Sequence, residues 1–245
     1  MHHFFVSPEQ IGENSILIKG NDVNHIKNVL RMKPGEKILI SDGAGCDYNC
    51  EVESLSDDSV TAKITDIQKE AKELPAKLVL FQALPKSDKM ELIIQKAVEL
   101  GAYEIVPVNT SRCVVKLDSK KEQSKLKRWN SIAESAAKQS KRSIIPQVRP
   151  VLSFDKAIAE AKDMEFGIIP YENFEDMTET KQILAKMPHC GRIGIFIGPE
   201  GGFSEKEVEL ALESGIRPVS LGKRILRTET AGLAILSVLM FSLED

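Results

Sequence analysis

The residues best suited to chemistry lie in a glycine-rich segment near the end of the chain, residues 198–202 (GPEGG). An apolar run at 193–197 precedes it, and Ser204 follows three residues before Glu207, which is capping-box spacing. Glycines permit positive φ and let a ligand approach the main chain, and a helix start offers unpaired N–H groups. The segment therefore predicts a ligand-binding turn between a buried strand and a helix.

The glycine spacing bears on which ligand this turn can bind. It differs from the GxGxxG pattern of dinucleotide-binding proteins, and the segment lacks the Lys-Ser/Thr pair of a P-loop. An enzyme that holds nucleotide phosphates on residues 198–202 would bind ATP or NAD. The spacing disfavours that class.

A second segment, residues 221–231 (LGKRILRTETA), also follows an apolar strand and leads into an apolar helix. Taken alone, Arg227 and Glu229 could be solvated charges at a helix start, with Thr228 as the cap.

A third segment, residues 84–101, begins LPKSDK and continues as an amphipathic helix with Ser87 as its expected cap and Gly101 as its expected end. Its charges alone indicate no more than a helix surface.

These three segments belong to a stretch in which strands and helices alternate. Apolar runs predict strands at 77–84, 105–108, 166–170, 193–197 and 218–221, and helical spacing predicts helices at 88–100, 123–140, 205–213 and 228–243. Such alternation indicates an α/β domain with a parallel sheet covered by helices.

The first 72 residues show a different pattern, typical of a small β unit. We expect strands at 3–6, 15–18, 37–41, 48–53 and 60–67, and one short helix capped by Asn21. Five short strands and one helix suggest a compact barrel. The polar residues 69–76 are expected to form a linker to the second domain.

Composition indicates a globular protein, since 42% of the residues are hydrophobic. The apolar run 231–243 is shorter than the roughly 20 residues of a membrane span, and the chain start does not resemble a signal peptide. We therefore expect a cytoplasmic protein with no membrane partner. The four cysteines have no CxxC spacing and lie far from the histidines, which favours buried thiols over a metal site.

The formal net charge of −3 does not indicate nucleic-acid binding, but the charges are unevenly distributed. Residues 112–149 contain eleven Lys/Arg against three Asp/Glu. Such a run is either a solvated helix face or a surface for a phosphate backbone.

Together, the three segments resemble the RsmE family of 16S rRNA (uracil-N3) methyltransferases, which belongs to the SPOUT superfamily. The resemblance rests on LPKSDK at 84–89, QSKR at 139–142, IGPEGG at 197–202 and LGKRILRTETA at 221–231, in that order. It extends over nearly the whole chain. The combination of the last two motifs, about 20 residues apart, is the most specific part.

The resemblance implies a fold, an assembly and a substrate. The fold would be a SPOUT-type α/β knot, a mostly parallel sheet with a deep trefoil knot, at 76–245, after a PUA-like β-barrel at 1–72. The protein would be a homodimer that acts on 16S rRNA of the small ribosomal subunit. No metal is implied.

The resemblance also implies S-adenosylmethionine as the cofactor, bound by three loops through apolar contacts and main-chain groups. By motif position the cofactor-binding residues are Ile169, Pro170, Tyr171, Ile197, Gly198, Pro199, Glu200, Gly201, Gly202, Leu221, Gly222, Ile225, Leu226, Arg227, Thr230 and Ala231.

The implied reaction needs a particular kind of catalytic group. N3 of uracil carries a proton and must lose it to become nucleophilic, so a base or a cation beside the developing anion is required. We expect Arg227 to supply the cation, and Glu200 or Glu229 to orient it or to handle the proton.

RNA contacts are expected in both domains, at Arg31, Lys33, Arg112, Lys138, Lys141 and Arg142. The chain departs from the family pattern at His2 and His3, where arginine is common, and at Lys138, where an acid is common.

Two other functions fit the same segments. One is a related SPOUT methyltransferase that acts on another RNA, such as tRNA. The other is a non-catalytic RNA-binding factor that retains a cofactor pocket.

Overall fold

The computed structural model describes residues 1–69 and 72–244, and the chain in it divides into two compact units. The first unit comprises Met1–Glu73 with Ala137–Ile145, and the second comprises Leu74–Ala136 with Pro146–Asp245. The expected linker at 69–76 includes residues 70 and 71, which lie outside the described residues. Within the described part of the chain, no helix is long and apolar enough to cross a membrane.

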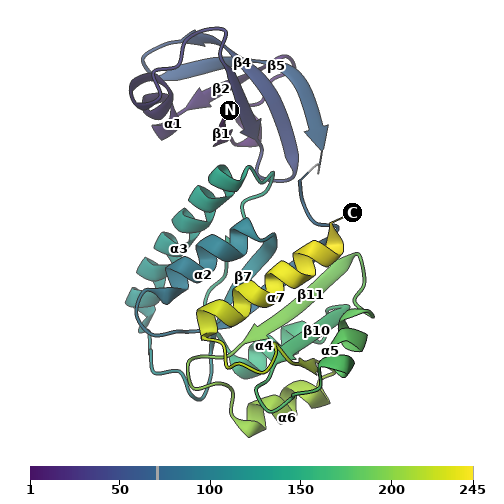
Figure 1. Ribbon diagram of the computed structural model, residues 1–245. Helices are drawn as coiled ribbons and strands as arrows, with labels where there is room; N and C mark the ends of the chain where they lie inside the picture. The colour runs from purple at the N-terminus through teal and green to yellow at the C-terminus, as the bar shows by residue number, and fades with distance from the viewer. Residues whose placement is uncertain (70–71, 245) are drawn as a thin grey trace. The chain divides into compact units, whose positions relative to one another are not determined.

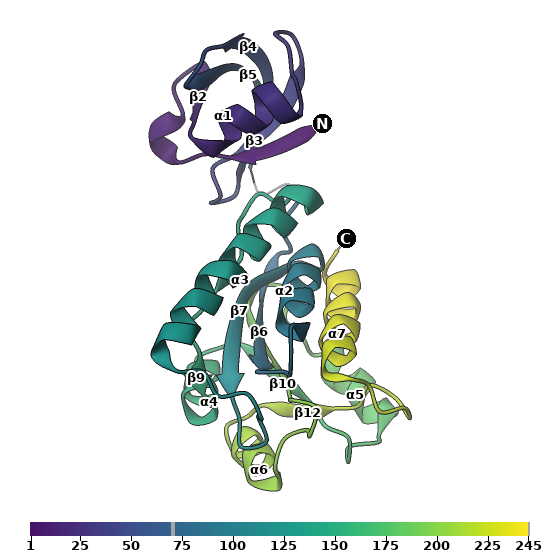
Figure 2. The same cartoon turned by 90° about the vertical axis from the view of Figure 1, so that its left-hand side faces the viewer.

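The first unit is built on a curled sheet of five strands in the order β1-β3-β4-β5-β2 (Figures 1 and 2). The strands are β1 (His2–Phe5), β2 (Ser15–Lys19), β3 (Lys37–Ser41), β4 (Cys46–Leu55) and β5 (Ser59–Lys69). All pairs are antiparallel except β1 with β3. Alternate residues of each strand face one apolar core, which also takes in Val23 and Ile26.

One helical segment crosses this sheet, as the sequence predicts, but its start is corrected. It comprises α1 (Asn21–Asn24) and a π-helical turn, η2 (His25–Val29), and a short 3₁₀ turn, η1 (Pro8–Gln10), precedes it. Asn21 is the first helical residue, and Gly20, with φ 80°, occupies the capping position. A glycine adopts this left-handed conformation without strain, so the position favours glycine over a residue whose side chain could cap the helix.

A chain of buried polar contacts links three neighbouring strands of the first unit, β1, β3 and β4. The His3 ring is hydrogen-bonded through Nε2 to the Ser41 hydroxyl at 2.7 Å, and that hydroxyl donates to Asp47, which also pairs with Lys72. Burial lowers the pKa of His3, although the hydrogen bond to the Lys138 main-chain oxygen opposes this. His3 is thus a structural residue rather than an exposed cation.

The second unit is an α/β domain with a parallel sheet, which confirms the predicted class. The sheet order is β12-β10-β11-β6-β7-β8, with β9 also paired to β7, and every recorded pair is parallel. The strands are β6 (Ala76–Ala83), β7 (Ala102–Asn109), β8 (Gln147–Val148), β9 (Leu152–Ser153), β10 (Phe166–Pro170), β11 (Gly191–Ile197) and β12 (Arg217–Val219).

Helices cover both faces of this sheet (Figures 1 and 2). They are α2 (Lys89–Glu99), α3 (Ser119–Ser140), α4 (Phe154–Ala161), α5 (Met177–Leu184), α6 (Glu205–Glu213) and α7 (Thr228–Leu243). On one face, Val79 and Phe81 of β6 pack with α4 and α6 in a core where Phe81 stacks on Phe196 at 4.4 Å. By strand alternation, Gln82 points to the opposite face, where α7 lies.

One helix terminus differs from expectation and another agrees. Helix α2 begins after Asp88, because Ser87 adopts φ 58° and cannot be its cap. Helix α6 has the expected capping box between Ser204 and Glu207.

The cysteines are not uniformly buried thiols, since Cys50 is buried, Cys46 and Cys113 are half-buried, and Cys190 is exposed.

Candidate functional site

The glycine-rich turn after β11 is as tight as its sequence predicts. Gly202 adopts φ 65°, and its N–H donates to the Pro199 oxygen at 2.9 Å. A Cβ on Gly198 would lie 3.2 Å from the carbonyl carbon of Gly202, closer than most real Cβ contacts. Only glycine lets the two arms of this turn approach so closely, so the turn presents main-chain atoms rather than side chains.

The second late segment lies against this turn. The Thr228 hydroxyl donates to the main-chain oxygen of Gly198 at 2.6 Å, and the buried Gln82 amide donates to the same hydroxyl at 2.9 Å. Strand β12 is at the edge of the sheet, so residues 220–227 must return past β10 to reach this point. The start of α7 is thereby fixed to the ends of β11 and β6.

A lysine joins the two acids that the sequence selects. Lys89 Nζ lies 2.9 Å from Glu200 Oε1 and 3.3 Å from Glu229 Oε2. The Lys86 N–H also donates to Glu200 Oε1 at 3.0 Å. Ser87, in its left-handed conformation, turns the chain sharply between these two lysines, so that a main-chain N–H and an ammonium converge on one carboxylate.

This arrangement fixes the charges of the cluster. Burial alone would raise the pKa of the Glu200 carboxyl, but hydrogen bonds from the Lys89 ammonium and the main chain hold it below its ordinary value. The same contacts with Glu200 and Glu229 raise the pKa of Lys89. Glu200 is therefore an ionised carboxylate and a weak base at neutral pH.

Arg227 differs from these acids because, within the described part of the chain, its side chain has no ion-pair partner. It occupies the capping position of α7 in an extended conformation and is exposed. Among the described residues, its guanidinium makes no recorded ion pair or hydrogen bond, and the recorded ion pairs of Glu200 and Glu229 are with Lys89. Arg227 is thus available to a ligand or substrate, while the two acids are held elsewhere.

The loop between β12 and α7 has the features of a surface that a ligand covers. Gly222 has φ 99°, and the Ile225 side chain is 86% exposed. In the described part of the chain, the N–H groups of Ile225 and Leu226 have no recorded main-chain acceptor. The third expected loop joins the same edge, because the Tyr171 N–H donates to the Val219 oxygen at 3.1 Å. Free N–H groups beside an exposed apolar side chain suit a flat heterocycle such as adenine.

The remaining cofactor-binding candidates lie at the ends of β10 and β11, in the loops that follow β11 and β12, and in the first turn of α7. Ile169, Ile197 and Pro199 are buried, Pro170, Leu221 and Ala231 are half-buried, and Gly201 and Thr230 are exposed.

Several residues of the site were not selected from the sequence. Lys89, Gln82 and Thr228 make the contacts that join the segments, although Lys89 is inside the LPKSDK motif and Thr228 inside LGKRILRTETA. These contacts join segments far apart in the sequence, because Lys89 is 111 residues from Glu200 and Gln82 is 146 residues from Thr228.

The expected RNA-binding residues fall into two groups. Arg31, Lys33 and Lys141 are exposed, and Arg31 and Lys141 have positive φ. The others have structural partners. Lys138 Nζ lies 3.4 Å from Asp22 Oδ1, and Arg112 donates to the Gly201 oxygen at 2.8 Å.

Arg142 is the most deeply buried of these basic residues and is held by an acid. It is 5% exposed, and its Nε donates to Glu73 Oε2 at 3.1 Å. Glu73 also accepts the Ser143 N–H at 2.9 Å. The guanidinium therefore fixes the segment after α3 within the first unit and is not presented to solvent.

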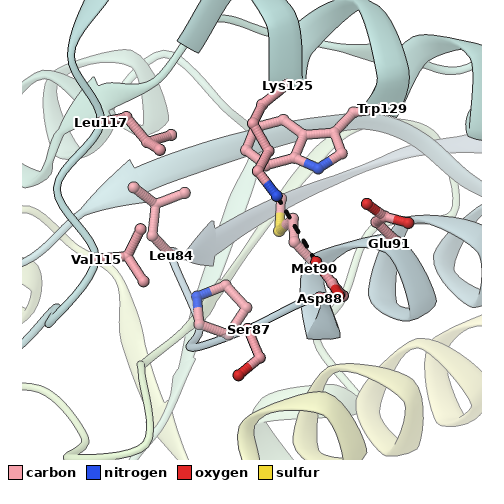
Figure 3. Close-up of a pocket in the computed structure, with 10 residues that line it drawn as sticks. Leu84, Ser87, Asp88, Met90, Glu91, Val115, Leu117, Lys125 and Trp129 are labelled. Carbon is pink, nitrogen blue, oxygen red and sulfur yellow. Dashed lines mark ion pairs between the residues drawn. The ribbon is translucent and has the colours of Figure 1, made fainter. Parts of the chain in front are cut away.

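A separate, small pocket lies between the end of β6, α2 and α3 (Figure 3), and its volume of about 30 Å³ leaves room for only a few water molecules. Its lining shares no residue with the three candidate cofactor loops. Among the described residues, no group of three or more His, Cys, Asp or Glu side chains could hold a metal ion.

Comparison with known proteins agrees with this geometry. Residues 72–240 match the RNA methyltransferase domain family, and residues 18–65 match the RNA methyltransferase PUA domain family. The chain is 39% identical to the ribosomal RNA small subunit methyltransferase E of Bacillus subtilis, over all of this chain and 98% of the relative.

Two solved structures are similar over almost the whole chain. One is ribosomal RNA small subunit methyltransferase E from Neisseria gonorrhoeae bound to S-adenosylmethionine, with 33% identity, a TM-score of 0.84, and 99% and 98% of the two chains covered. The other, from Legionella pneumophila, is a methyltransferase complex with bound S-adenosylmethionine, with 32% identity, a TM-score of 0.83, and 98% and 97% covered.

Proposed function

This chain belongs to the ribosomal RNA small subunit methyltransferase E family, and we propose that it transfers a methyl group from S-adenosylmethionine to N3 of one uridine in 16S rRNA. The observation that carries the proposal is the junction of the two late segments. There the Thr228 hydroxyl meets the Gly198 oxygen, Lys89 pairs with Glu200 and Glu229, and Arg227 directly precedes Thr228 in the chain.

The three loops after β10, β11 and β12 would hold the cofactor. The glycine turn at 198–202 leaves its main chain accessible, and Ile225 offers an apolar surface for the adenine. When bound, S-adenosylmethionine supplies an electrophilic methyl group on a sulfonium. The chain's own part is to fix that group beside the acceptor base, which lowers the entropic barrier to transfer.

Arg227 would act on the acceptor base. Its guanidinium is exposed and makes no recorded ion pair, so it can approach the uracil and stabilise negative charge as N3 loses its proton. Glu200 is held ionised by Lys89, so its proposed part is to position Lys89 and the turn rather than to accept a proton. Glu229 is the remaining candidate for the proton acceptor, because its contact with Lys89 is longer, at 3.3 Å, than the 2.9 Å contact of Glu200.

RNA would be bound by exposed lysine and arginine side chains of both units. Arg31, Lys33 and Lys141 are the principal candidates, since their ammonium or guanidinium groups are exposed. Arg112 and Lys138 would add phosphate contacts beside their structural hydrogen bonds. The burial of Arg142 against Glu73 argues for leaving it out. The first unit would serve as the PUA-like barrel at 1–72, and the methyltransferase domain would span 76–245.

The finer features of the fold and assembly belong to the same proposal. We propose a trefoil knot in the second unit, supported by the return of residues 220–227 from the edge strand β12 to the sheet centre. A homodimer is supported by the exposed apolar side chains Leu92 of α2 and Val238 and Phe241 of α7, two helices that pack together. The protein would work in the cytoplasm, where small subunits are assembled.

Labelled methyl transfer tests the function. Purified protein and radiolabelled S-adenosylmethionine are incubated separately with small ribosomal subunits, large subunits and bulk tRNA from a strain lacking this gene. We expect label in 16S rRNA alone. Label in tRNA instead would favour the related SPOUT enzyme, and cofactor binding by calorimetry without transfer would favour the non-catalytic RNA-binding factor.

A further inference from the structure

The turn that follows β7, residues 110–113, is held firmly against the start of α6. The Ser111 N–H donates to Glu207 Oε1 at 2.7 Å, and the Ser111 hydroxyl donates to Glu207 Oε2 at 3.0 Å. Glu207 is buried and also belongs to the capping box of α6. Within the turn, the Cys113 N–H donates to the Thr110 oxygen at 3.1 Å. The main chain of this turn is therefore fixed relative to α6.

Arg112 extends from this turn to the glycine-rich turn at 198–202. Its Nη1 donates to the Gly201 oxygen at 2.8 Å. The stem of the side chain lies beside the same glycine, because a Cβ on Gly201 would be 3.6 Å from Arg112 Cβ and 3.7 Å from Arg112 Cδ. Since the glycine-rich turn is proposed to bind the cofactor, Arg112 is bonded directly to the proposed cofactor site.

The hydrogen bond to Gly201 leaves one edge of the guanidinium available. Arg112 is exposed, and among the described residues its Nε and Nη2 have no recorded hydrogen-bond or ion-pair partner. Arg142 illustrates what this edge can bind, because its Nε and Nη2 both donate to Glu73. A guanidinium edge binds a phosphate in the same two-pronged manner. Arg112 can therefore hold the Gly201 oxygen and an anion together.

The surroundings of Arg112 favour such an anion. Residues 112–128 contain seven Lys/Arg against two Asp/Glu, and Lys116 among them is exposed. One carboxylate is close, since Glu172 Oε1 would be 3.8 Å, and Arg112 Nη1 4.0 Å, from a Cβ on Gly202. Within the described part of the chain, however, no ion pair joins Glu172 to Arg112. The charge of Arg112 thus remains available to a phosphate.

We propose that Arg112 couples the binding of RNA to the binding of S-adenosylmethionine, as a positioning residue that bonds the Gly201 oxygen and an RNA phosphate at the same time. The inference deepens the proposed function and rests on it, because it takes RNA as the substrate and 198–202 as the cofactor turn. A phosphate on the free edge would fix the guanidinium, and through it the Gly201 oxygen. A bound cofactor would fix the same guanidinium for the phosphate, so each ligand should strengthen the other by the same factor.

Equilibrium binding of each ligand, with and without the other, tests this coupling in the full-length protein. The probe is S-adenosylhomocysteine, which lacks the transferable methyl group and so leaves the RNA unmodified. Its Kd is measured by calorimetry alone and with saturating 16S rRNA from a strain lacking the gene, and the Kd of the rRNA is measured with and without the probe. We expect each ligand to lower the Kd of the other by about 5-fold or more, with equal factors.

A matched pair of variants assigns the coupling to Arg112. Arg112→Met keeps the stem beside Gly201 and removes every guanidinium donor. In this variant, rRNA should no longer change the Kd of S-adenosylhomocysteine, and the probe should no longer change the Kd of the rRNA. Lys116→Met removes an exposed charge four residues away, and it should keep the coupling factor of the wild type.

The outcomes separate this proposal from the proposed function. Independent binding of the two ligands to the wild type would overturn the coupling. Coupling of wild-type strength in Arg112→Met would overturn it as well, because another contact would then transmit the effect. An equal loss in Lys116→Met would assign the effect to general charge and not to Arg112. Failure of the wild type to methylate 16S rRNA would instead overturn the proposed function.

Discussion

The Thr228 hydroxyl donates a hydrogen bond to the main-chain oxygen of Gly198, 2.6 Å away, across 30 residues of sequence. This contact joins the turn after β11 to the start of α7. It is supported from beneath by the Gln82 amide, which donates to the same hydroxyl. The relation between these two residues sets the distance between the two loops that we propose to hold S-adenosylmethionine.

Replacing this hydroxyl should weaken both the fold and cofactor binding. Thr228→Val keeps the shape but leaves the Gly198 oxygen without its donor, which should lower the free energy of unfolding by about 1–3 kcal/mol. Affinity for S-adenosylmethionine should fall as the loops separate. Urea unfolding and calorimetry measure the two effects. Thr178→Val, at an exposed position of α5, should change neither, and a full-affinity Thr228 variant would contradict the account.

Arg227→Ala should slow methyl transfer far more than it weakens cofactor binding. Loss of one group that stabilises a developing anion typically reduces kcat by about 10²–10³. Single-turnover methylation at saturating S-adenosylmethionine measures this directly. Arg224→Ala removes another exposed arginine of the same loop and should retain most activity. A folded Arg227 variant with wild-type kcat would remove this residue from the mechanism.

Glu207 should make stability dependent on acid. Burial opposes ionisation of this carboxyl, but hydrogen bonds from Ser111 and Ser204 hold its pKa below the ordinary value. A lowered folded-state pKa means that the stabilisation is present above the ordinary carboxyl pKa and lost as the pH falls through the folded-state pKa.

Glu207→Gln should therefore lower the free energy of unfolding at neutral pH by about 1–3 kcal/mol. The difference from wild type should shrink as the solution is acidified. Urea unfolding at a series of pH values measures it, and a difference that is constant across the series would count against the assignment.

The salt dependence of RNA binding should identify the exposed basic side chains that contact phosphates. Reversing Lys141 to Glu should weaken binding to 16S rRNA and reduce the slope of log affinity against log salt by about 1. Lys162→Glu, at an exposed lysine after α4, is the control and should leave the slope unchanged. If both variants have the wild-type slope, residue 141 belongs to a solvated surface.

Much of the second unit follows from local sequence patterns. Strand β10, helix α6 and helix α7 have the expected bounds, because each is a continuous apolar run or a capped helical repeat. Helices α4 and α5 were not expected, since each has only eight residues. The signal for α4 was present in Phe154, Ala157, Ile158 and Ala161, which share one face and follow the cap at Ser153.

The candidate site was less accessible to sequence reasoning than the fold. Local patterns indicate the turn at 198–202, because strand, glycines and capped helix are contiguous. They do not indicate that Lys89 lies between Glu200 and Glu229, since that depends on β6 pairing with β11. The burial of Arg142 was hidden for the same reason, because its partner Glu73 lies 69 residues away.

The central claim is that this protein methylates N3 of one uridine in 16S rRNA. A mass-spectrometric map of 16S rRNA from a strain lacking the gene, complemented with wild type or with Arg227→Ala, tests it most directly. We predict a single 3-methyluridine that is absent without the gene, restored by wild type and strongly reduced with the variant. An identical 16S map in all strains would contradict the account.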